Sequence, residues 1–305
     1  MNVVIQWIRK AQKIYLPISH PERKQPKSLL KVFAFLLLLS PFISSNSFAE
    51  MINARAAVGM DATTGEIFYA KNPTRQLAPA STTKLMTAIL AIEKENFSKV
   101  VMISKNASNA QPAKAGFKAG DKVSVEGLLY AALLESANDA AVALAETVAG
   151  SEERFVRFMN EKAVDIGASN TKFINATGLP GYGQYTTALD LSIIMKYAMG
   201  NFALRGIIQT LSTEVSTKKG ETLFFRNTDK LLWSDEKVIG GKTGFTRRAQ
   251  HCFVCAAQDE SKTIIIALLG SPSRRTLWND AEKLIAKGFQ DNPPFKVASD
   301  ESMLP

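Results

Sequence analysis

Histidine and cysteine are scarce in this chain, which has 305 residues and two of each. One histidine, His251, falls within residues 50–305, and it lies in an apolar run that is typical of a buried strand. A Ser-His-Asp triad would have to take its base from that core position. No cluster of His, Cys, Asp and Glu has the spacing of zinc ligands. The sequence therefore favours chemistry without a histidine base, and we expect no metal and no other cofactor.

The two cysteines, Cys252 and Cys255, form a C-x-x-C sequence within the same apolar run. Residues three apart on a strand point to opposite faces, so these thiols should not meet in a disulfide. A redox or metal site is the alternative. We expect two buried free cysteines, because an unpaired cysteine behaves as a small apolar residue.

The positive charge of the chain is concentrated at its beginning. The net charge is +9, and residues 1–49 carry seven basic residues and one acid, a net of +6, which leaves +3 for residues 50–305. A nucleic-acid-binding domain would show its basic residues on the folded part. We therefore expect no nucleic-acid partner.

The basic beginning has the layout of a secretory signal peptide. Lys27 and Lys31 precede an apolar run at residues 32–39, and the small residues Ser47 and Ala49 stand before a potential cleavage site. The run is short for a membrane-spanning helix. We expect residues 1–49 to be a signal peptide and the protein to be exported, to the periplasm or the cell-wall side of the inner membrane. The long basic region leaves an uncleaved leader as the alternative, and membrane contact would then be made through it.

Strand patterns at both ends of the chain enclose a helical middle. Expected strands cover residues 54–60, 66–70, 239–246, 252–257 and 262–270. Expected helices begin at about Ser81 and cover residues 125–137, 139–149, 152–166, 188–199 and 274–289. This order predicts an α/β fold of the α+β type, with one sheet built from both ends and a helical insert. We expect one catalytic domain at residues 50–290 and a polar tail at residues 291–305.

The first of three short motifs is Ser81-Thr82-Thr83-Lys84, at the start of an expected helix. Residues three apart on a helix share a face, so the Lys84 amine can reach the Ser81 hydroxyl. Burial or a neighbouring cation lowers the pKa of a lysine and makes it a general base. A solvent-facing S-x-x-K that arises by chance is the alternative, which this motif alone does not exclude.

The second motif, Ser136-Ala137-Asn138, lies between two expected helices. A serine hydroxyl there can relay a proton, and an asparagine amide can bind a substrate carbonyl. Because serine and asparagine are also common helix caps, a purely structural role is the alternative.

The third motif is the segment Gly240-Gly241-Lys242-Thr243-Gly244-Phe245-Thr246. Its glycines allow the backbone to approach a ligand closely. Lys242 supplies a cation for a carboxylate and can also lower the pKa of Lys84 by charge repulsion. Thr243 and Thr246 offer hydroxyl donors to the same carboxylate. A glycine-rich turn without a ligand is the alternative.

In order and spacing, the three motifs resemble those of the active-site serine DD-peptidases. The match is to the low-molecular-mass penicillin-binding proteins of the D-alanyl-D-alanine carboxypeptidase family, and it covers nearly all of residues 50–290. The resemblance implies a β-lactamase/DD-peptidase-like fold, with an antiparallel sheet flanked by helices, an all-helical lobe and the active site between them. It implies Ser81 as the acyl-enzyme nucleophile, Lys84 as general base, Ser136 as proton relay, Asn138, Lys242, Thr243 and Thr246 as substrate-binding residues, and the N–H groups of Ser81 and Phe245 as the oxyanion hole.

The function implied is a penicillin-sensitive serine carboxypeptidase that trims peptidoglycan stem peptides, with β-lactams as inhibitors. An endopeptidase that cleaves peptidoglycan crosslinks with the same site is the main alternative, favoured by the short chain after the catalytic domain. A β-lactamase would need a glutamate that positions water, which the sequence does not identify, and a non-catalytic cell-wall binder would not need Lys84. The family usually continues from the third motif with Ala-Gly, whereas this chain has Arg247-Arg248. These two cations can alter which peptide end or crosslink is accepted.

Overall fold

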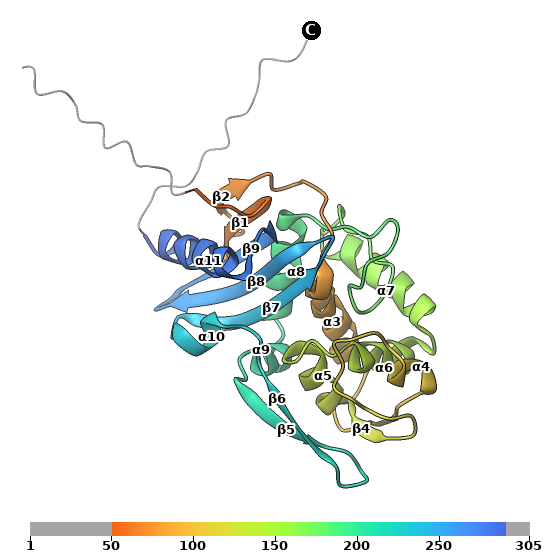
Figure 1. Cartoon of the computed structure of the whole chain (residues 1–305). Helices are drawn as coiled ribbons and strands as arrows, with labels where there is room; N and C mark the ends of the chain where they lie inside the picture. Colours follow the sequence, from red (N-terminus) through yellow and green to blue (C-terminus); the bar gives the residue numbers. More distant parts are fainter. Residues whose placement is uncertain (1–50, 291–305) are drawn as a thin grey trace, which may run out of the picture. The chain divides into compact units, whose positions relative to one another are not determined.

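Both ends of the folded chain contribute to one five-stranded antiparallel sheet, which confirms the predicted fold class (Figure 1). The computed structural model describes residues 51–290, so the expected leader and the expected polar tail lie outside the described residues. The strand order is β2-β1-β9-β8-β7. The strands are β1 (Ala56–Asp61), β2 (Ile67–Lys71), β7 (Val238–Thr246), β8 (Gln250–Asp259) and β9 (Lys262–Ser271). Strand β7 therefore lies at an edge of the sheet.

Turn residues explain how the first hairpin closes. The Asp61 carboxylate accepts hydrogen bonds from the backbone N–H groups of Thr63 and Thr64, at 2.8 and 2.9 Å. Gly65 follows with a φ of +80°, a conformation that favours glycine. Local chemistry thus stabilises this turn, and β1 also pairs with β9 in the centre of the sheet.

The two faces of the sheet are both buried, and each contributes to a separate core cluster. Cys252 packs in the cluster on the face of the helical lobe, and Cys255 in the cluster on the other face. Helix α11 (Arg274–Gly288) covers that other face, where the rings of Phe253 and Trp278 meet edge to face with centroids 5.0 Å apart. Both cysteines are buried and free, as predicted.

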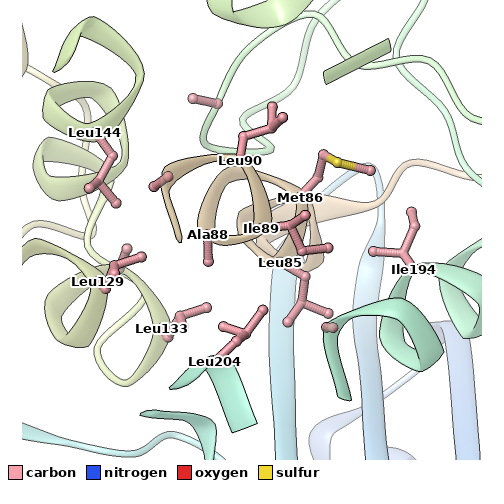
Figure 2. Close-up of a cluster of buried hydrophobic side chains, with 14 of the residues drawn as sticks. Leu85, Met86, Ala88, Ile89, Leu90, Leu129, Leu133, Leu144, Ile194 and Leu204 are labelled. Atoms are coloured by element: carbon pink, nitrogen blue, oxygen red, sulfur yellow. The ribbon is translucent and has the colours of Figure 1, made fainter. Parts of the chain in front are cut away.

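Helix α3 (Lys84–Lys94) runs through the core between the sheet and the helical lobe (Figure 2). Its first eight residues, 84–91, are all buried. Neighbours shown in Figure 2 come from α5 (Val125–Leu133), α6 (Asn138–Ala149), α8 (Ala188–Met199) and α9 (Phe202–Ile208). Burying each large side chain stabilises the folded state by about 1.5–3 kcal/mol. Because α3 contacts neighbours on all sides, these contributions fix its position. Lys84, at its first position, is consequently 0% exposed.

The rest of the described chain consists of short elements that the sequence analysis did not predict. They are α4 (Lys105–Ser108), α9 and α10 (Leu231–Ser234), with the hairpins β3 (Val100–Met102)–β4 (Lys122–Ser124) and β5 (Ser212–Ser216)–β6 (Thr222–Arg226). The 3₁₀ turn η1 (Ala80–Thr83) lies where a helix was expected to begin. The longer α7 (Glu152–Asp165) agrees with its predicted helix. In residues 51–290, every helix is too short or too polar to cross a bilayer.

Two predicted helices have wrong boundaries, both at the functional motifs. The helix expected at residues 125–137 ends at Leu133, because Ser136 has a φ of +62° and the N–H of Ala137 bonds back to the Ala131 carbonyl at 3.0 Å. That bond spans six residues instead of the four of an α-helix, so the backbone has left the helix before Ala137. At the first motif, Ser81 lies in the 3₁₀ turn η1, and the α-helix begins only at Lys84.

Candidate active site

The Lys84 amine lies within hydrogen-bond distance of three oxygens. It is 2.7 Å from Asn138 Oδ1, 2.8 Å from the Thr177 carbonyl and 3.1 Å from Ser81 Oγ. The first two oxygens can only accept, whereas the Ser81 hydroxyl can also donate. A neutral amine, with two hydrogens and one lone pair, satisfies both carbonyl oxygens and directs its lone pair at Ser81. The structure thus brings together the first motif and the asparagine of the second.

Lys84 is held in surroundings that disfavour its charged form. Burial is the largest cause and lowers the pKa of Lys84 well below its usual value. The charge of Lys242 lowers this pKa further, and the carboxylate of Asp139 acts in the opposite direction. Both lowering effects are those proposed from the sequence, and they favour the neutral amine, which can accept a proton.

Lys242 lies below the surface and is not among the residues that line the pocket around Ser81. Its side chain is 1% exposed, and its amine donates to the Thr243 carbonyl at 3.0 Å. Burial lowers the pKa of Lys242 to about 7, opposed by the charges of Asp229 and Glu135. Burial also raises the pKa of Asp229 to about 6. The charges of Asp229 and Glu135 therefore favour the protonated form of Lys242, which burial disfavours.

Two glycines let the chain close around the turn that carries Ser81. A Cβ at Gly244 would lie 2.9 Å from the Ser81 nitrogen, so only glycine allows β7 to approach η1 this closely. A Cβ at Gly178 would lie 1.8 Å from the Ala80 carbonyl oxygen, and Gly178 also has a φ of +82°. Ala80 itself has a φ of +49°, an uncommon conformation for alanine. The surrounding chain therefore fixes the position of Ser81.

A pocket of about 430 Å³ opens at Ser81. The predicted site residues that line it with Ser81 are Ser136, Asn138, Thr243, Phe245 and Thr246.

The hydroxyl groups at this pocket differ in the hydrogen bonds that they already form. Ser136 Oγ is buried and has no hydrogen-bond partner in the part of the chain that is described. Thr243 Oγ1 lies 2.8 Å from Thr228 Oγ1, and Thr246 Oγ1 accepts from the Ala249 N–H at 2.9 Å. The Thr246 hydroxyl can therefore still donate a hydrogen bond to a ligand. A buried unpartnered hydroxyl such as Ser136 costs free energy unless a ligand completes it.

The Asn138 side chain is tied on both sides. Its oxygen accepts from Lys84, and its nitrogen donates to the Gln111 carbonyl at 2.8 Å. One N–H of the amide is left for a substrate carbonyl.

A family model described as D-alanyl-D-alanine carboxypeptidase matches residues 43–273, which include all three motifs. The chain belongs to this carboxypeptidase family. Membership agrees with the resemblance that the motifs carry.

Known members of the carboxypeptidase family and its structural neighbours are similar over most of the chain. The carboxypeptidase DacF of Bacillus subtilis is 33% identical over 251 residues, which are 80% of this chain and 64% of that protein. The chain thus spans less than two thirds of that relative. The D-alanyl-D-alanine endopeptidase of Escherichia coli is 28% identical over 85% of this chain and 82% of its own. The crystal structure of the Streptomyces K15 DD-transpeptidase superposes with a TM-score of 0.73, at 33% identity, over 78% of this chain and 98% of that one.

His251 of this family member lies at the pocket, so the expectation of a core histidine is wrong. It is half-buried and lines the pocket, and its ring lies 4.5 Å from that of Phe245, its cross-strand partner. Burial, and then the charge of Arg274, lowers the pKa of His251. The apolar run predicted the strand correctly. Whether His251 is covered depends on where helix α11 begins, which the run does not show.

Two further charged residues of this carboxypeptidase-family pocket were missed from the sequence. Glu135 lines the pocket and accepts a hydrogen bond from the Arg226 N–H at 2.9 Å. Arg274, exposed at the start of α11, lines it as well. Glu135 directly precedes Ser136, a signal that was available. Arg274 reaches the site only because β9 ends beside β8, which no local pattern shows.

Arg247 and Arg248 do not line this pocket. No three His, Cys, Asp or Glu side chains within residues 51–290 are grouped as metal ligands.

Proposed function

We propose that this protein is a serine-type D-alanyl-D-alanine carboxypeptidase that trims peptidoglycan stem peptides through an acyl-enzyme. The observation that supports this most is the Lys84 amine, which lies within hydrogen-bond distance of Asn138 Oδ1, the Thr177 carbonyl and Ser81 Oγ. In its neutral form, the amine donates to the two carbonyl oxygens and leaves its lone pair for the Ser81 hydroxyl. A base oriented in this way, with a lowered pKa, is what a serine nucleophile needs.

In the acylation step, Ser81 Oγ attacks the carbonyl carbon of the penultimate D-alanine while its proton passes to Lys84. The oxygen of the tetrahedral intermediate accepts from the backbone N–H groups of Ser81 and Phe245, which Gly244 brings close. The bond to the terminal D-alanine then breaks. Its nitrogen takes the proton from Lys84 through the otherwise unpartnered hydroxyl of Ser136.

Hydrolysis of the acyl-enzyme repeats these steps with water as the nucleophile. Lys84 takes a proton from water, the ester bond to Ser81 breaks, and Ser81 Oγ recovers its proton. β-Lactams would acylate Ser81 in the same way. No step uses a metal or another cofactor.

The terminal carboxylate would be bound by Thr243 and Arg274. Thr243 pairs with Phe253 across the sheet, so it lies on the face that α11 covers, and Arg274 starts that helix. Arg274 is exposed and lines the pocket, whereas Lys242 is buried. We therefore infer that Arg274 contacts the carboxylate and that Lys242 acts mainly by lowering the pKa of Lys84. Thr246 and Asn138 would bind the acyl part of the substrate.

The test is to incubate the purified chain with a mixture of muropeptides and identify the products by mass. Loss of one D-alanine from pentapeptides supports the proposal. A Ser81→Ala preparation under the same conditions serves as the control. Products that leave every pentapeptide intact would contradict a carboxypeptidase.

An endopeptidase is the second candidate, favoured by similarity to the Escherichia coli D-alanyl-D-alanine endopeptidase over 82% of that protein. The same geometry at Ser81 would cleave the D-alanyl bond of a crosslink. In the muropeptide assay, this activity converts crosslinked dimers to monomers without changing the pentapeptide monomers.

We also propose export to the periplasm or the cell-wall side of the inner membrane, because residues 1–49 have the composition of a signal peptide. Cell fractionation and N-terminal sequencing of the mature protein test this. A mature chain that starts at Glu50 supports cleavage, and one that retains the apolar run supports an anchor. Recovery from the cytoplasmic fraction would contradict export.

A further inference from the structure

A second pocket, of about 450 Å³, lies next to the one at Ser81. Two arginines, Arg55 and Arg248, line it together with polar side chains that include Gln76, Gln184 and Tyr185. Arg55 immediately precedes strand β1, and Arg248 belongs to the turn between β7 and β8. The structure thus brings the two cations together from segments that are almost 200 residues apart in the sequence.

The charge of this pocket is not compensated. No aspartate or glutamate lines it, and neither arginine forms an ion pair with any residue in 51–290. The polar contact of the Arg248 guanidinium is a 3.4 Å bond from Nη1 to the Gly181 carbonyl, at the long end of the hydrogen-bond range. Both side chains therefore have donors available for an anion.

Arg55 is held in place by the sheet below it. A Cβ at Gly270 would lie 2.7 Å from Arg55 Cδ, so the absence of a side chain at Gly270 makes room for the arginine stem. Gly270 also has a φ of +72°, which favours glycine. A guanidinium whose stem is packed in this way loses less conformational entropy when it binds a ligand.

The two pockets have no lining residue in common, but the same three chain segments contribute to both. Ala78 lines the second pocket, and Ser81 lines the catalytic one three residues later. Likewise, the loop that contributes Leu179 to the catalytic pocket contributes Gln184 to the second. The third shared segment runs from Thr246, at the catalytic pocket, to Arg248. The contact between Arg248 and Gly181 joins two of these segments.

The direction of a bound peptide follows from the sheet. Strand β7 is at the edge, and every pairing in the sheet is antiparallel. An extended peptide that adds antiparallel to β7, with its reacting carbonyl at the Phe245 N–H, places the released residue beside Thr243. The residues that precede the scissile bond then run past Thr246 toward Arg248, at about 3.3 Å per residue.

We propose that Arg55 and Arg248 bind a free carboxylate on the acyl side of the substrate, carried by one of the two residues before the D-alanine that acylates Ser81. Paired guanidinium groups suit a planar carboxylate, which accepts several hydrogen bonds from them. The subsite selects stem peptides with an acidic group at this position over peptides in which it is amidated. This proposal rests on the proposed peptidase function, because it places the substrate along β7.

The experiment uses two synthetic peptides that end in D-Ala-D-Ala and differ only in an upstream side chain, which carries a carboxylate in one and a carboxamide in the other. For the full chain, we expect kcat/KM for the acid to exceed that for the amide by about tenfold, a ratio typical of one charge-assisted contact. The ratio should fall toward one in an Arg55→Gln, Arg248→Gln double variant. Arg247→Gln is the matched control and should keep the preference, because Arg247 lines neither pocket.

Binding to a Ser81→Ala variant, measured by calorimetry, tests the subsite without relying on turnover. The acid should bind about tenfold more tightly than the amide, and high salt should reduce the difference. Equal affinities and equal rates for the two peptides, or a preference that survives in the double variant, would overturn the subsite. Failure of both peptides to react, together with no penicillin labelling of Ser81, would instead overturn the peptidase function, and the binding ratio would still decide the subsite.

Discussion

The Asn138 amide oxygen accepts a 2.7 Å hydrogen bond from the Lys84 amine, across 54 residues of sequence. Because the Asn138 nitrogen donates to the Gln111 carbonyl, the amide cannot rotate without losing both bonds. The asparagine of the second motif therefore orients the lysine of the first. This adds a positioning role to the substrate-binding role expected from the sequence.

Replacement of that oxygen by a charge should change the pH dependence of the enzyme. In Asn138→Asp, a carboxylate beside Lys84 stabilises the charged amine and raises the pKa of Lys84. A base with a higher pKa loses its proton at higher pH, so the acid limb of the acylation profile should move upward. The measurement is the rate of penicillin acylation against pH, with Asn279→Asp on the exposed side of α11 as the control. An unchanged profile would rule out Lys84 as the titrating base.

Removal of the Ser81 hydroxyl should abolish both covalent labelling by fluorescent penicillin and peptidase activity. No other hydroxyl lies within hydrogen-bond distance of the Lys84 amine in the described chain. Gel fluorescence and release of D-alanine measure the two losses. Ser212→Ala, on the exposed strand β5, should label normally. Full labelling of Ser81→Ala would mean that another residue is the nucleophile.

A change of Lys84 to arginine keeps the positive charge but removes the base, since a guanidinium does not release its proton in a protein. We expect Lys84→Arg to lose more than tenfold in acylation rate, a barrier increase above about 1.4 kcal/mol. Because the site is fully buried, circular dichroism must show that the variant is folded. If a folded variant keeps more than about a tenth of the rate, the role of Lys84 is electrostatic.

Replacing Arg274 and replacing Lys242 should reduce activity in different ways. Arg274→Ala should reduce kcat/KM for a substrate with a free terminal carboxylate about tenfold more than for its amide, a difference of ~1.4 kcal/mol. Arg275→Ala is the matched control, because Arg275 is exposed and does not line the pocket. An equal effect of Arg274→Ala on the two substrates would show that Arg274 does not bind the terminal carboxylate.

Lys242→Ala should lower the rates for acid and amide substrates alike. Without the charge of Lys242, the pKa of Lys84 rises, so the acid limb of the profile moves to higher pH. Steady-state kinetics across pH for both substrates measures this. A loss of activity confined to the free-acid substrate would show that Lys242 binds the terminal carboxylate, as expected from the sequence.

The grouping of the site residues was more predictable from the sequence than the boundaries of the helices that carry them. Ser81 and Lys84 are three residues apart, so any helical turn brings them together, whether 3₁₀ or α. The end of the preceding lobe helix was missed because Ser136 has a left-handed backbone conformation that serine rarely adopts. The residues on either side of Ser136 are held by hydrogen bonds of their own, from Ala137 to Ala131 and from Arg226 to Glu135, and the second of these joins segments that are far apart in the sequence.

The sheet shows the same division. The apolar runs of β8 and β9 predicted buried strands, and the spacing of the cysteines predicted their opposite faces. The strand order was not predictable in detail, and it is this order that carries Arg274 to the catalytic pocket and Arg55 to the second one. Residues that reach a site through tertiary arrangement leave no periodic signal in the sequence.

The burial of α3 on all sides links catalysis to the global stability of the protein. Segments with many buried apolar contacts open only when the whole domain unfolds, whereas exposed hairpins such as β5–β6 open locally. Lys84, at the start of this helix, therefore belongs to the part of the molecule that we expect to exchange its amide hydrogens last. On heating, the lysine should keep its alignment with the serine until cooperative unfolding begins, so acylation and tertiary structure are lost in one transition rather than two.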